Sequence, residues 1–326
     1  IGVVNVPDPR LERLESLVDP ERVMPATVEI VDIAGLVRGA SKGEGLGNQF
    51  LSNIRETDAI LHVLRCFDND NIVHVDGSVD PIRDKETIDL ELQLKDLETV
   101  EKRLEKVSRA ARTGNKEAIK EQEVLDQVQK GLATATSVRA LAIAEDDRQA
   151  YVVSLQLLTD KPVLYVCNVD ESSAVKGNAY VDEVRKTVDP EGAEVLVLAV
   201  STEADINELE TYEERQLFLD DLGLTEPGAA KLIRSAYAIL DLHTYFTAGE
   251  KEVRAWTISQ GFTAPQAAGV IHTDFEKGFI RAEVISYNDY DQLETEAKVK
   301  EAGKMRVEGK DYVVQDGDVM HFRFNV

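Results

Sequence analysis

Four short apolar runs are the feature of this sequence that most constrains its fold. They lie at 28–33, 59–65, 162–167 and 194–200. Each run has the length of a buried β-strand, and helical patterns follow the first and third runs. Strands that alternate with helices favour a mostly parallel sheet with helices packed on it. We therefore predict an α/β domain built on these four strands.

A long helical segment separates the first two strands from the last two. The segment 84–150 contains no proline, and Leu90, Leu97 and Leu104 recur in it at heptad spacing. A second apolar series begins at Ile119, after a polar turn. This pattern predicts an antiparallel helical hairpin inserted into the α/β domain.

The tip of this hairpin is basic, although the chain as a whole is acidic. Seven lysines and arginines lie between residues 102 and 120, while the net charge of the chain is −24. The tip is therefore a candidate for contact with RNA phosphates. A charged face that meets only solvent, or a hairpin that serves only for packing, explains the same residues.

The acidic balance also restricts the expected partners. A net charge of −24 disfavours bulk attraction to nucleic acid or to an anionic membrane, so we expect neither DNA nor a membrane as a partner. The apolar runs, such as 195–200, are far too short to span a bilayer. Cys66 and Cys167 lie in apolar runs, as expected of buried reduced thiols. These features predict a cytoplasmic protein.

The C-terminal part of the chain returns to strand-like patterns. Runs at 252–258 and 278–285 flank a helix candidate at 263–275, and Asp316-Gly317 predicts a hairpin between two alternating runs. Together they predict a small α+β domain of ubiquitin-like size. The predicted boundaries are 1–83 and 151–240 for the two parts of the α/β domain, 84–150 for the insertion and 241–326 for the C-terminal domain.

The first apolar run ends in a pattern that is typical of nucleotide-dependent switches. Asp32 and Gly35 form D-x-x-G, and further glycines follow up to Gly47. In this pattern the carboxylate holds a Mg²⁺-bound water and the glycine amide donates to a γ-phosphate. The glycine-rich segment can then move when the phosphate leaves. We predict Asp32 as the metal-site residue and Gly35 as a catalytic residue; an ordinary surface loop is the alternative.

A second polar motif follows the third apolar run. Asn168, Val169 and Glu171 stand where guanine-reading GTPases carry N-K-x-D, with Val169 in the lysine position and Glu171 in the aspartate position. That aspartate accepts hydrogen bonds from guanine, whereas adenine offers an acceptor there, so this variant weakens the selectivity for guanine and admits adenine. Asn168 can bond either purine. Ser201 and Thr202, after the fourth run, are candidates to close over the base, and Phe67 completes the nucleotide-binding set.

Several stretches together resemble the YchF subfamily of Obg-like ATPases. These stretches are 31–60, 168–171, 244–258 and 272–326. The resemblance implies a P-loop G domain, interrupted by a coiled-coil-like helical insertion and followed by a TGS domain of β-grasp fold. It also implies Mg²⁺-dependent hydrolysis of ATP, with GTP bound more weakly. The implied partner is the ribosome, as large subunit or 70S particle, met through the basic hairpin and the TGS domain, with protein regulators as further partners.

The same resemblance places His74 at the family's catalytic histidine position. An imidazole is suited to orient or deprotonate a water near neutral pH. Ras-like enzymes use a glutamine just after D-x-x-G instead, and here that position is Leu36, which cannot orient water. A surface-loop histidine without a role is the alternative for His74.

The sequence departs from the family in one respect: it contains no G-x-x-x-x-G-K-[ST] phosphate loop. The family carries this loop and a switch-I threonine before the equivalent of Ile1. Without the amides, lysine and hydroxyl of the loop, triphosphate binding should collapse. We therefore expect the sequence to be a fragment and the chain as given to be inactive; a natural variant without the loop is the alternative.

Two functions remain open at this point. The first is a ribosome-associated regulatory switch that hydrolyses ATP to ADP and phosphate, and GTP more weakly. The second is a non-catalytic module in which the hairpin and the TGS domain bind the ribosome, RNA or a protein.

Overall fold

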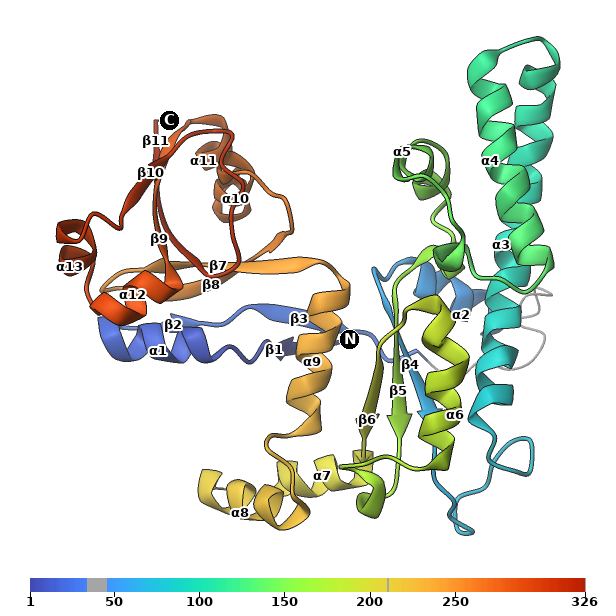
Figure 1. The fold of residues 1–326 in the computed structure, drawn as a ribbon, viewed down its shortest axis with the longest axis horizontal. Helices are drawn as coiled ribbons and strands as arrows, with labels where there is room; N and C mark the ends of the chain where they lie inside the picture. The colour runs from blue at the N-terminus through green and yellow to red at the C-terminus, as the bar shows by residue number, and fades with distance from the viewer. Residues whose placement is uncertain (34–45, 210, 326) are drawn as a thin grey trace. The chain divides into compact units, whose positions relative to one another are not determined.

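The structure is a computed structural model that describes residues 1–33, 46–209 and 211–325 (Figure 1). The chain packs as two compact units, Val31–Lys231 on the one hand and Ile1–Ile30 with Leu232–Val326 on the other. Each unit has its own sheet and its own hydrophobic cores. Among the described residues, no helix is both long enough and apolar enough to cross a membrane.

A three-stranded parallel sheet forms the centre of the unit Val31–Lys231. Its strands are β4 (Ile60–Arg65), β5 (Val163–Asn168) and β6 (Val195–Leu198), with β5 in the middle. All residues of β5 except Asn168 are buried, which is the pattern of a strand covered on both faces. Val181 and Val184 of helix α6 pack in the core that this sheet forms. The three later apolar runs are therefore strands of one parallel sheet, as predicted.

The helices of this unit surround the sheet and form the insertion. They are α2 (Leu46–Arg55), α3 (Pro81–Arg112), α4 (Lys116–Ala133), α5 (Glu145–Asp147), α6 (Ala179–Val188), α7 (Val200–Glu208), α8 (Tyr212–Leu222) and the start of α9 (Gly228–Ile239). Between α5 and β5 the chain forms short helical turns, among them η3 (Arg148–Val152), η4 (Val153–Leu155) and η5 (Leu158–Asp160).

The first apolar run does not join the parallel sheet. β3 (Thr27–Ile30) pairs antiparallel with β1 (Gly2–Asn5) in a separate two-stranded sheet. Its burial alternates, with Val28 buried between exposed neighbours. Such alternation is typical of an antiparallel strand with one solvent-facing side, not of a strand covered on both sides. The prediction that all four runs share one sheet is therefore wrong for the run at 28–33.

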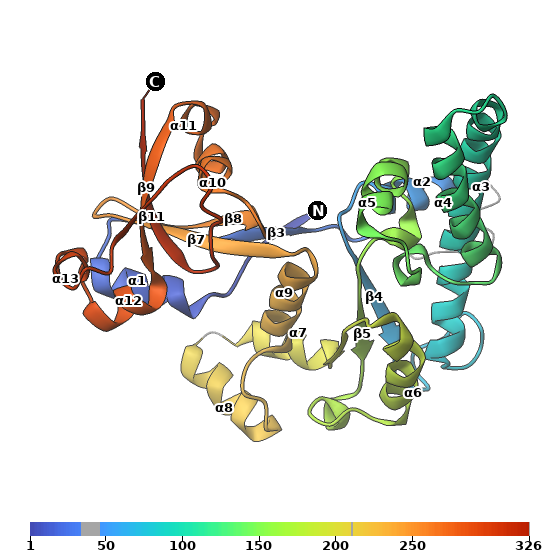
Figure 2. The ribbon, with the colours of Figure 1, turned by 45° about the horizontal axis from the view of Figure 1, so that its top comes forward.

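Helices α3 and α4 form the predicted antiparallel hairpin, and they lie side by side in both views (Figures 1 and 2). Gly114 makes the turn with a φ of +84°, and the Asn115 side chain accepts hydrogen bonds from the first turn of α4. Val100 and Leu104 of α3 pack against Leu125 of α4 and its neighbours. The hairpin thus has a small apolar core of its own.

The heptad pairing covers only part of α3. Leu90 is 51% exposed and Leu94 is 42% exposed, whereas Leu104 is 8% exposed. The reason is length, because α3 has 32 residues and α4 has 18, so the first part of α3 has no α4 beside it. That part is instead buried against the α/β core, through Leu92 and Asp96.

A buried ion network fixes the base of α3 to the parallel sheet. Lys85 Nζ lies 2.7 Å from Asp89 Oδ2 and 2.9 Å from Glu191 Oε1. Arg139 Nη2 donates to Glu191 Oε2 at 2.9 Å and to the Tyr165 hydroxyl of β5 at 3.2 Å. Burial alone would lower the pKa of Lys85, but the carboxylate of Asp89 holds that pKa above its usual value. The network therefore stays charged at neutral pH.

The other unit contains a six-stranded sheet in the order β10-β9-β11-β7-β8-β2. Its strands are β2 (Val23–Met24), β7 (Leu242–Ala248), β8 (Val253–Ser259), β9 (Phe279–Ser286), β10 (Arg306–Glu308) and β11 (Asp318–Phe324). β7 and β8 form a hairpin, and β11 pairs parallel with β7 and antiparallel with β9. Helix α10 (Ala264–Ile271) lies in the chain between β8 and β9 and packs Ala264, Ala267 and Ala268 into the core. This gives the predicted β-grasp arrangement.

The helices of this unit are α1 (Pro9–Val18), α10 (Ala264–Ile271), α11 (Thr273–Lys277), α12 (Tyr287–Leu293) and α13 (Glu296–Glu301). Leu11 and Leu14 of α1 lie in one core with Phe246 and Ile285 of the sheet. The predicted boundaries group residues 1–30 with the α/β domain. In the structure these residues instead pack with the C-terminal strands, because the apolar face of α1 is buried against those strands.

The hairpin predicted at Asp316-Gly317 does not form. β11 pairs with β9 and β7, and in the preceding run Val313 makes only an isolated bridge with Thr263. The turn is tied to β7 instead, because Asp316 Oδ1 accepts from Thr244 N–H at 2.8 Å and Gly317 N–H donates to the Thr244 carbonyl at 2.7 Å. The Asp-Gly pair therefore leads the chain across to β7 rather than back on itself.

Candidate functional site

The carboxyl ends of β4, β5 and β6 meet at one edge of the parallel sheet. Just past β4, Cys66 N–H donates to the Asn168 carbonyl at 2.7 Å. Just past β5, Val169 N–H donates to the Leu198 carbonyl at 3.0 Å. Open α/β sheets bind their ligands outside the carboxyl ends of the strands. This edge is therefore the candidate ligand site.

Asn168 is oriented by the start of α7. Its Oδ1 atom accepts a hydrogen bond from Val200 N–H at 3.1 Å. A backbone N–H only donates, so the amide of Asn168 must turn its two Nδ2 protons away from α7. The side chain therefore offers donors to a ligand, and these suit a ring nitrogen acceptor such as N7 of either purine.

α7 also brings the two predicted hydroxyl residues to this edge. Ser201 is exposed, whereas Thr202 is 1% exposed. The buried Thr202 Oγ1 has no hydrogen-bond partner among the described residues. A buried polar atom without a partner costs about 1–3 kcal/mol. A ligand group that reached this hydroxyl would remove that cost, so the atom fits a ligand-binding position.

Phe67 and Glu171 border the same edge. The Arg65 guanidinium lies over the Phe67 ring at 4.8 Å from its centroid, and Nε donates to the Phe67 carbonyl at 3.1 Å. The same guanidinium donates to the carbonyls of Asn69 and Ile72, which fixes the loop that follows β4. Glu171 begins a 3₁₀ turn after β5 and is exposed. Both residues are accessible to a ligand.

Val169 differs from its neighbours in the predicted set. It is 2% exposed and lies in the core with Val181 and Ala199. Successive side chains of an extended chain point to opposite sides, so the residue after Asn168 faces inward. In contrast to the prediction, the Val169 side chain is not offered to a ligand at this edge.

The switch residues are only partly within the described chain. Asp32 lies two residues past β3 and is exposed, so its carboxylate is accessible to a hydrated cation. Gly35 and Leu36 lie outside the described residues, and their expected roles stay predictions.

His74 lies on the loop between β4 and α3, with both ring nitrogens in hydrogen bonds. Asp76 N–H donates to Nδ1 at 3.1 Å, and Nε2 lies 2.8 Å from Asp84 Oδ2 in the first turn of α3. Because the backbone N–H can only donate, Nδ1 carries no proton and Nε2 donates its proton to Asp84. Arg83 Nη2 donates to the other oxygen of Asp84 at 3.2 Å. The sequence did not indicate Asp84, because its partner is ten residues away and outside any helical pattern.

The same loop gathers three groups of the metal-ligating type. Ligand atoms of His74, Asp76 and Asp84 lie within 4.8 Å of one another. The Arg83 guanidinium lies 3.8 Å from Asp76 and 3.2 Å from Asp84, so a positive charge already occupies the cluster. His74 Nε2 also carries a proton in this arrangement. We therefore assign no metal to this cluster.

Two further polar residues support the sheet edge. Asn178 Nδ2 donates to the Cys66 carbonyl at 2.7 Å, and the same side chain caps α6. The Glu203 carboxylate accepts from Gly228 N–H at 2.7 Å and so caps α9. An asparagine just before a helical pattern is an N-cap signal that could have found Asn178. No local signal predicts Glu203, whose partner is 25 residues away.

Comparisons with known proteins identify the family. A model described as a 50S ribosome-binding GTPase matches residues 15–102, and the model of the YchF GTPase C-terminal domain, described as a protein of unknown function, matches residues 242–325. The ribosome-binding ATPase YchF of Haemophilus ducreyi is 56% identical over 325 residues, which cover 100% of this chain and 89% of that protein. The chain belongs to the YchF family.

Further YchF proteins agree with this assignment. The ribosome-binding ATPase YchF of Bacillus subtilis is 53% identical over 328 residues, with 100% of this chain and 89% of that protein covered. The solved structure of the Schizosaccharomyces pombe YchF GTPase is 40% identical, covers 98% of this chain and 86% of that chain, and has a TM-score of 0.89. This YchF chain therefore has the predicted P-loop GTPase fold with a helical insertion and a C-terminal domain.

Proposed function

We propose that this chain works as part of a ribosome-associated ATPase whose nucleotide state acts as a switch. Together with a phosphate loop, it hydrolyses ATP to ADP and phosphate, and it hydrolyses GTP more weakly. The observation that carries the proposal is sequence identity over the whole chain. It amounts to 56% and 53% with two proteins that are named ribosome-binding ATPases. Association with ribosomes would place the protein in the cytoplasm, and proteins that regulate it would be further partners there.

The nucleotide base is assigned to the carboxyl edge of the parallel sheet. Asn168 would donate to purine N7, and the α7 start with Ser201 and Thr202 would close over the ring. The unpartnered Thr202 hydroxyl supports this assignment. Glu171 is exposed and longer than the aspartate of N-K-x-D, which supports adenine over guanine.

A bound Mg²⁺–ATP would supply the reactive γ-phosphate and a metal charge that stabilises it. Mg²⁺ keeps several waters and takes one or two carboxylates beside the phosphates, and the exposed Asp32 fits that requirement. Gly35 is proposed to sense the γ-phosphate. Release of phosphate would then free the glycine-rich segment that follows Asp32.

His74 is proposed to orient and deprotonate the attacking water. The bond from Nε2 to Asp84 supports this role, because the carboxylate fixes the orientation and tautomer of the ring. The accepting atom is therefore Nδ1. Asp76 N–H covers Nδ1 in this conformation, so the turn from His74 to Asp76 must open before a water can take its place.

A second candidate function is a binding module that hydrolyses nothing. The absence of a G-x-x-x-x-G-K-[ST] motif within these 326 residues favours it for the chain as given. In this case the ribosome, RNA or a protein is bound irrespective of nucleotide.

Co-sedimentation with ribosomes separates the two functions. We expect a form with a phosphate loop before Ile1 to pellet with ribosomes to a different extent in ATP and in ADP. The 326-residue chain should show no dependence on nucleotide and serves as the control. Equal pelleting of the loop-containing form in ATP, ADP and buffer would exclude the switch and leave the binding module.

A further inference from the structure

We propose that a basic groove between α2 and α3 binds the phosphodiester backbone of RNA. The choice of RNA as the polymer rests on the ribosome association proposed above. The groove is a hollow of about 370 Å³ along α3, and it takes in the first three cations of the basic stretch 102–120 but none of those nearer the turn at Gly114. Lys95, Lys102, Arg103 and Lys106 of α3 line it, and Arg55 from the end of α2 closes it.

The charge of the groove contrasts with that of the chain. Its lining carries these five cations and a single acid, Glu98, in a chain of net charge −24. One of the five, Arg103, is paired with Glu121 of α4 at 2.6 Å. Among the described residues, no carboxylate forms an ion pair with Arg55 or Lys106. Both side chains are therefore available to a phosphate. A local basic patch of this kind is what an otherwise acidic protein needs to bind a polyanion.

Glu98 pairs with two of the lysines of the groove. Its carboxylate bonds Lys95 Nζ at 2.8 Å and also bonds Lys102. These bonds, that from Lys102 first, lower the pKa of Glu98 to about 2, so it stays ionised at neutral pH. The pair with Lys102 is exposed to solvent and therefore weak, so a phosphate can take this lysine from Glu98.

The spacing of the cations suits a row of phosphates. Residues 95, 99, 102 and 106 share one face of α3. At ~1.5 Å per residue, Lys95 and Lys106 lie ~16 Å apart along the helix axis. This span exceeds a single phosphate or nucleoside phosphate and matches a short stretch of polymer backbone.

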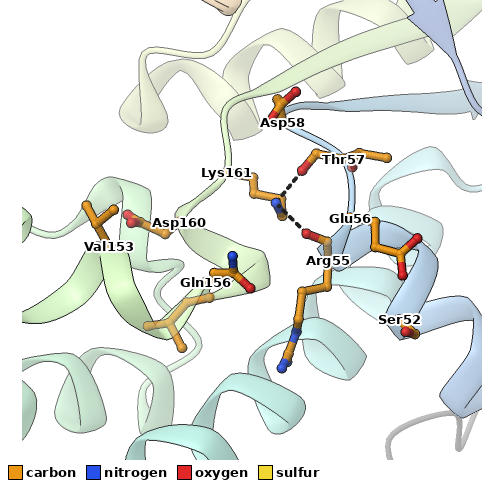
Figure 3. Close-up of a pocket in the computed structure, with 10 residues that line it drawn as sticks. Ser52, Arg55, Glu56, Thr57, Asp58, Val153, Gln156, Asp160 and Lys161 are labelled. Atoms are coloured by element: carbon orange, nitrogen blue, oxygen red, sulfur yellow. Dashed lines mark hydrogen bonds between the residues drawn. The ribbon is translucent and has the colours of Figure 1, made fainter.

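A second hollow, drawn in Figure 3, shares the lining residue Arg55 with the groove. It measures about 570 Å³ and presents the hydroxyls of Ser52 and Thr57 and the amide of Gln156. Gln156 adopts a left-handed φ of 48°, a conformation that costs a non-glycine residue of order 1 kcal/mol and that clusters at binding sites. Such uncharged polar groups can bond bases and the ribose 2′-hydroxyl.

The acidic residues of the second hollow indicate which part of the RNA lies there, and they disfavour an acidic peptide as the ligand. Glu56, Asp58 and Asp160 line it together with Lys161. Lys161 is occupied, since it donates to the backbone carbonyls of Arg55 and Thr57. The carboxylates would repel an acidic peptide but accept hydrogen bonds from hydroxyl and amino groups. The phosphates therefore lie along α3, and sugars and bases lie in the second hollow.

The test is the binding of a fluorescein-labelled single-stranded RNA of about 12 nucleotides to the 326-residue chain, measured by anisotropy without nucleotide. The groove variant K102E/K106E and the tip variant R112E/K116E change the net charge equally. We expect the groove variant to weaken binding at least about tenfold and to reduce the slope of log affinity against log salt by about 1.4. The tip variant should change the affinity by less than about threefold.

Three outcomes would overturn the proposal. They are equal losses in the two variants, no loss in either, and tighter binding of a labelled oligoglutamate than of RNA. The variant Q156A should reduce the preference for RNA over DNA of the same sequence, and an unchanged preference would refute the role of the second hollow. Thermal unfolding of each variant checks the fold. Because the assay contains neither ribosomes nor ATP, its failure leaves the switch untouched, and failure of the switch leaves the groove untouched.

Discussion

In a form of the protein that binds ATP, H74A is expected to lower the single-turnover rate of hydrolysis by about 10²- to 10⁴-fold, the usual contribution of a positioned acid–base group. The affinity for ATP should not change, because His74 is assigned to the water and not to the nucleotide. Single-turnover hydrolysis and equilibrium ATP binding, measured on the same preparations, check both parts. An unchanged rate would remove His74 from the mechanism.

The partner of His74 provides a graded control for this prediction. D84N keeps the shape of the side chain but replaces the carboxylate that accepts from Nε2 by a neutral amide. We expect a smaller loss than for H74A, of about tenfold, with ATP affinity preserved. Asp76 and Arg83 also face this pair and are unchanged in the variant. A loss in D84N that exceeds the loss in H74A would show that Asp84 acts by some other route than His74.

The largest stability effect is expected at Glu191. E191A removes the acceptor shared by Lys85, Arg139 and the Tyr165 hydroxyl, and it leaves one carboxylate, Asp89, to compensate two largely buried cations. Breaking one side of a buried ion network costs about 3–5 kcal/mol. Urea unfolding should show this as a lower midpoint at an unchanged slope.

The control for Glu191 is the exposed Glu183 on α6. E183A makes the same chemical change outside the network and should alter the free energy of unfolding by less than about 0.5 kcal/mol. Equal effects of the two variants would mean that the network does not fix the base of α3. A loss of unfolding free energy in E191A alone would support the role of the network in fixing the base of α3.

The sequence predicts well those elements whose pattern is local. The runs at 59–65, 162–167 and 194–200 form the parallel sheet. The central run is apolar throughout because it is covered on both faces, whereas β4 and β6 are only partly buried. The helical hairpin was predictable because Val100, Leu104 and Val107 repeat at helical spacing in α3, as do Leu125, Val128 and Leu132 in α4.

The misplaced elements depend on partners far away in the chain. The run at 28–33 pairs with residues 2–5, and nothing in its own pattern excludes the parallel sheet. The Asp316-Gly317 turn looks like a hairpin signal, but Thr244 of β7 captures it. In both cases a tertiary contact overrides a local propensity.

The candidate site likewise combines features that a local sequence pattern marks with features that depend on distant contacts. The position of Asn168 follows from the end of a buried strand, which the sequence marks clearly. The inward side chain of Val169 and the bond between His74 and Asp84 depend on register and on loop path, which the sequence does not mark.

The central claim is that this chain supplies the base-reading and water-orienting parts of an ATPase. Its most direct test is equilibrium binding of ATP and GTP, with Mg²⁺, to a form in which a phosphate loop precedes Ile1, with the 326-residue chain as the control. We predict that the extended form binds ATP at least about tenfold more tightly than GTP and that the control binds neither appreciably. Tighter binding of GTP, or equal ATP binding by the two forms, would contradict the account.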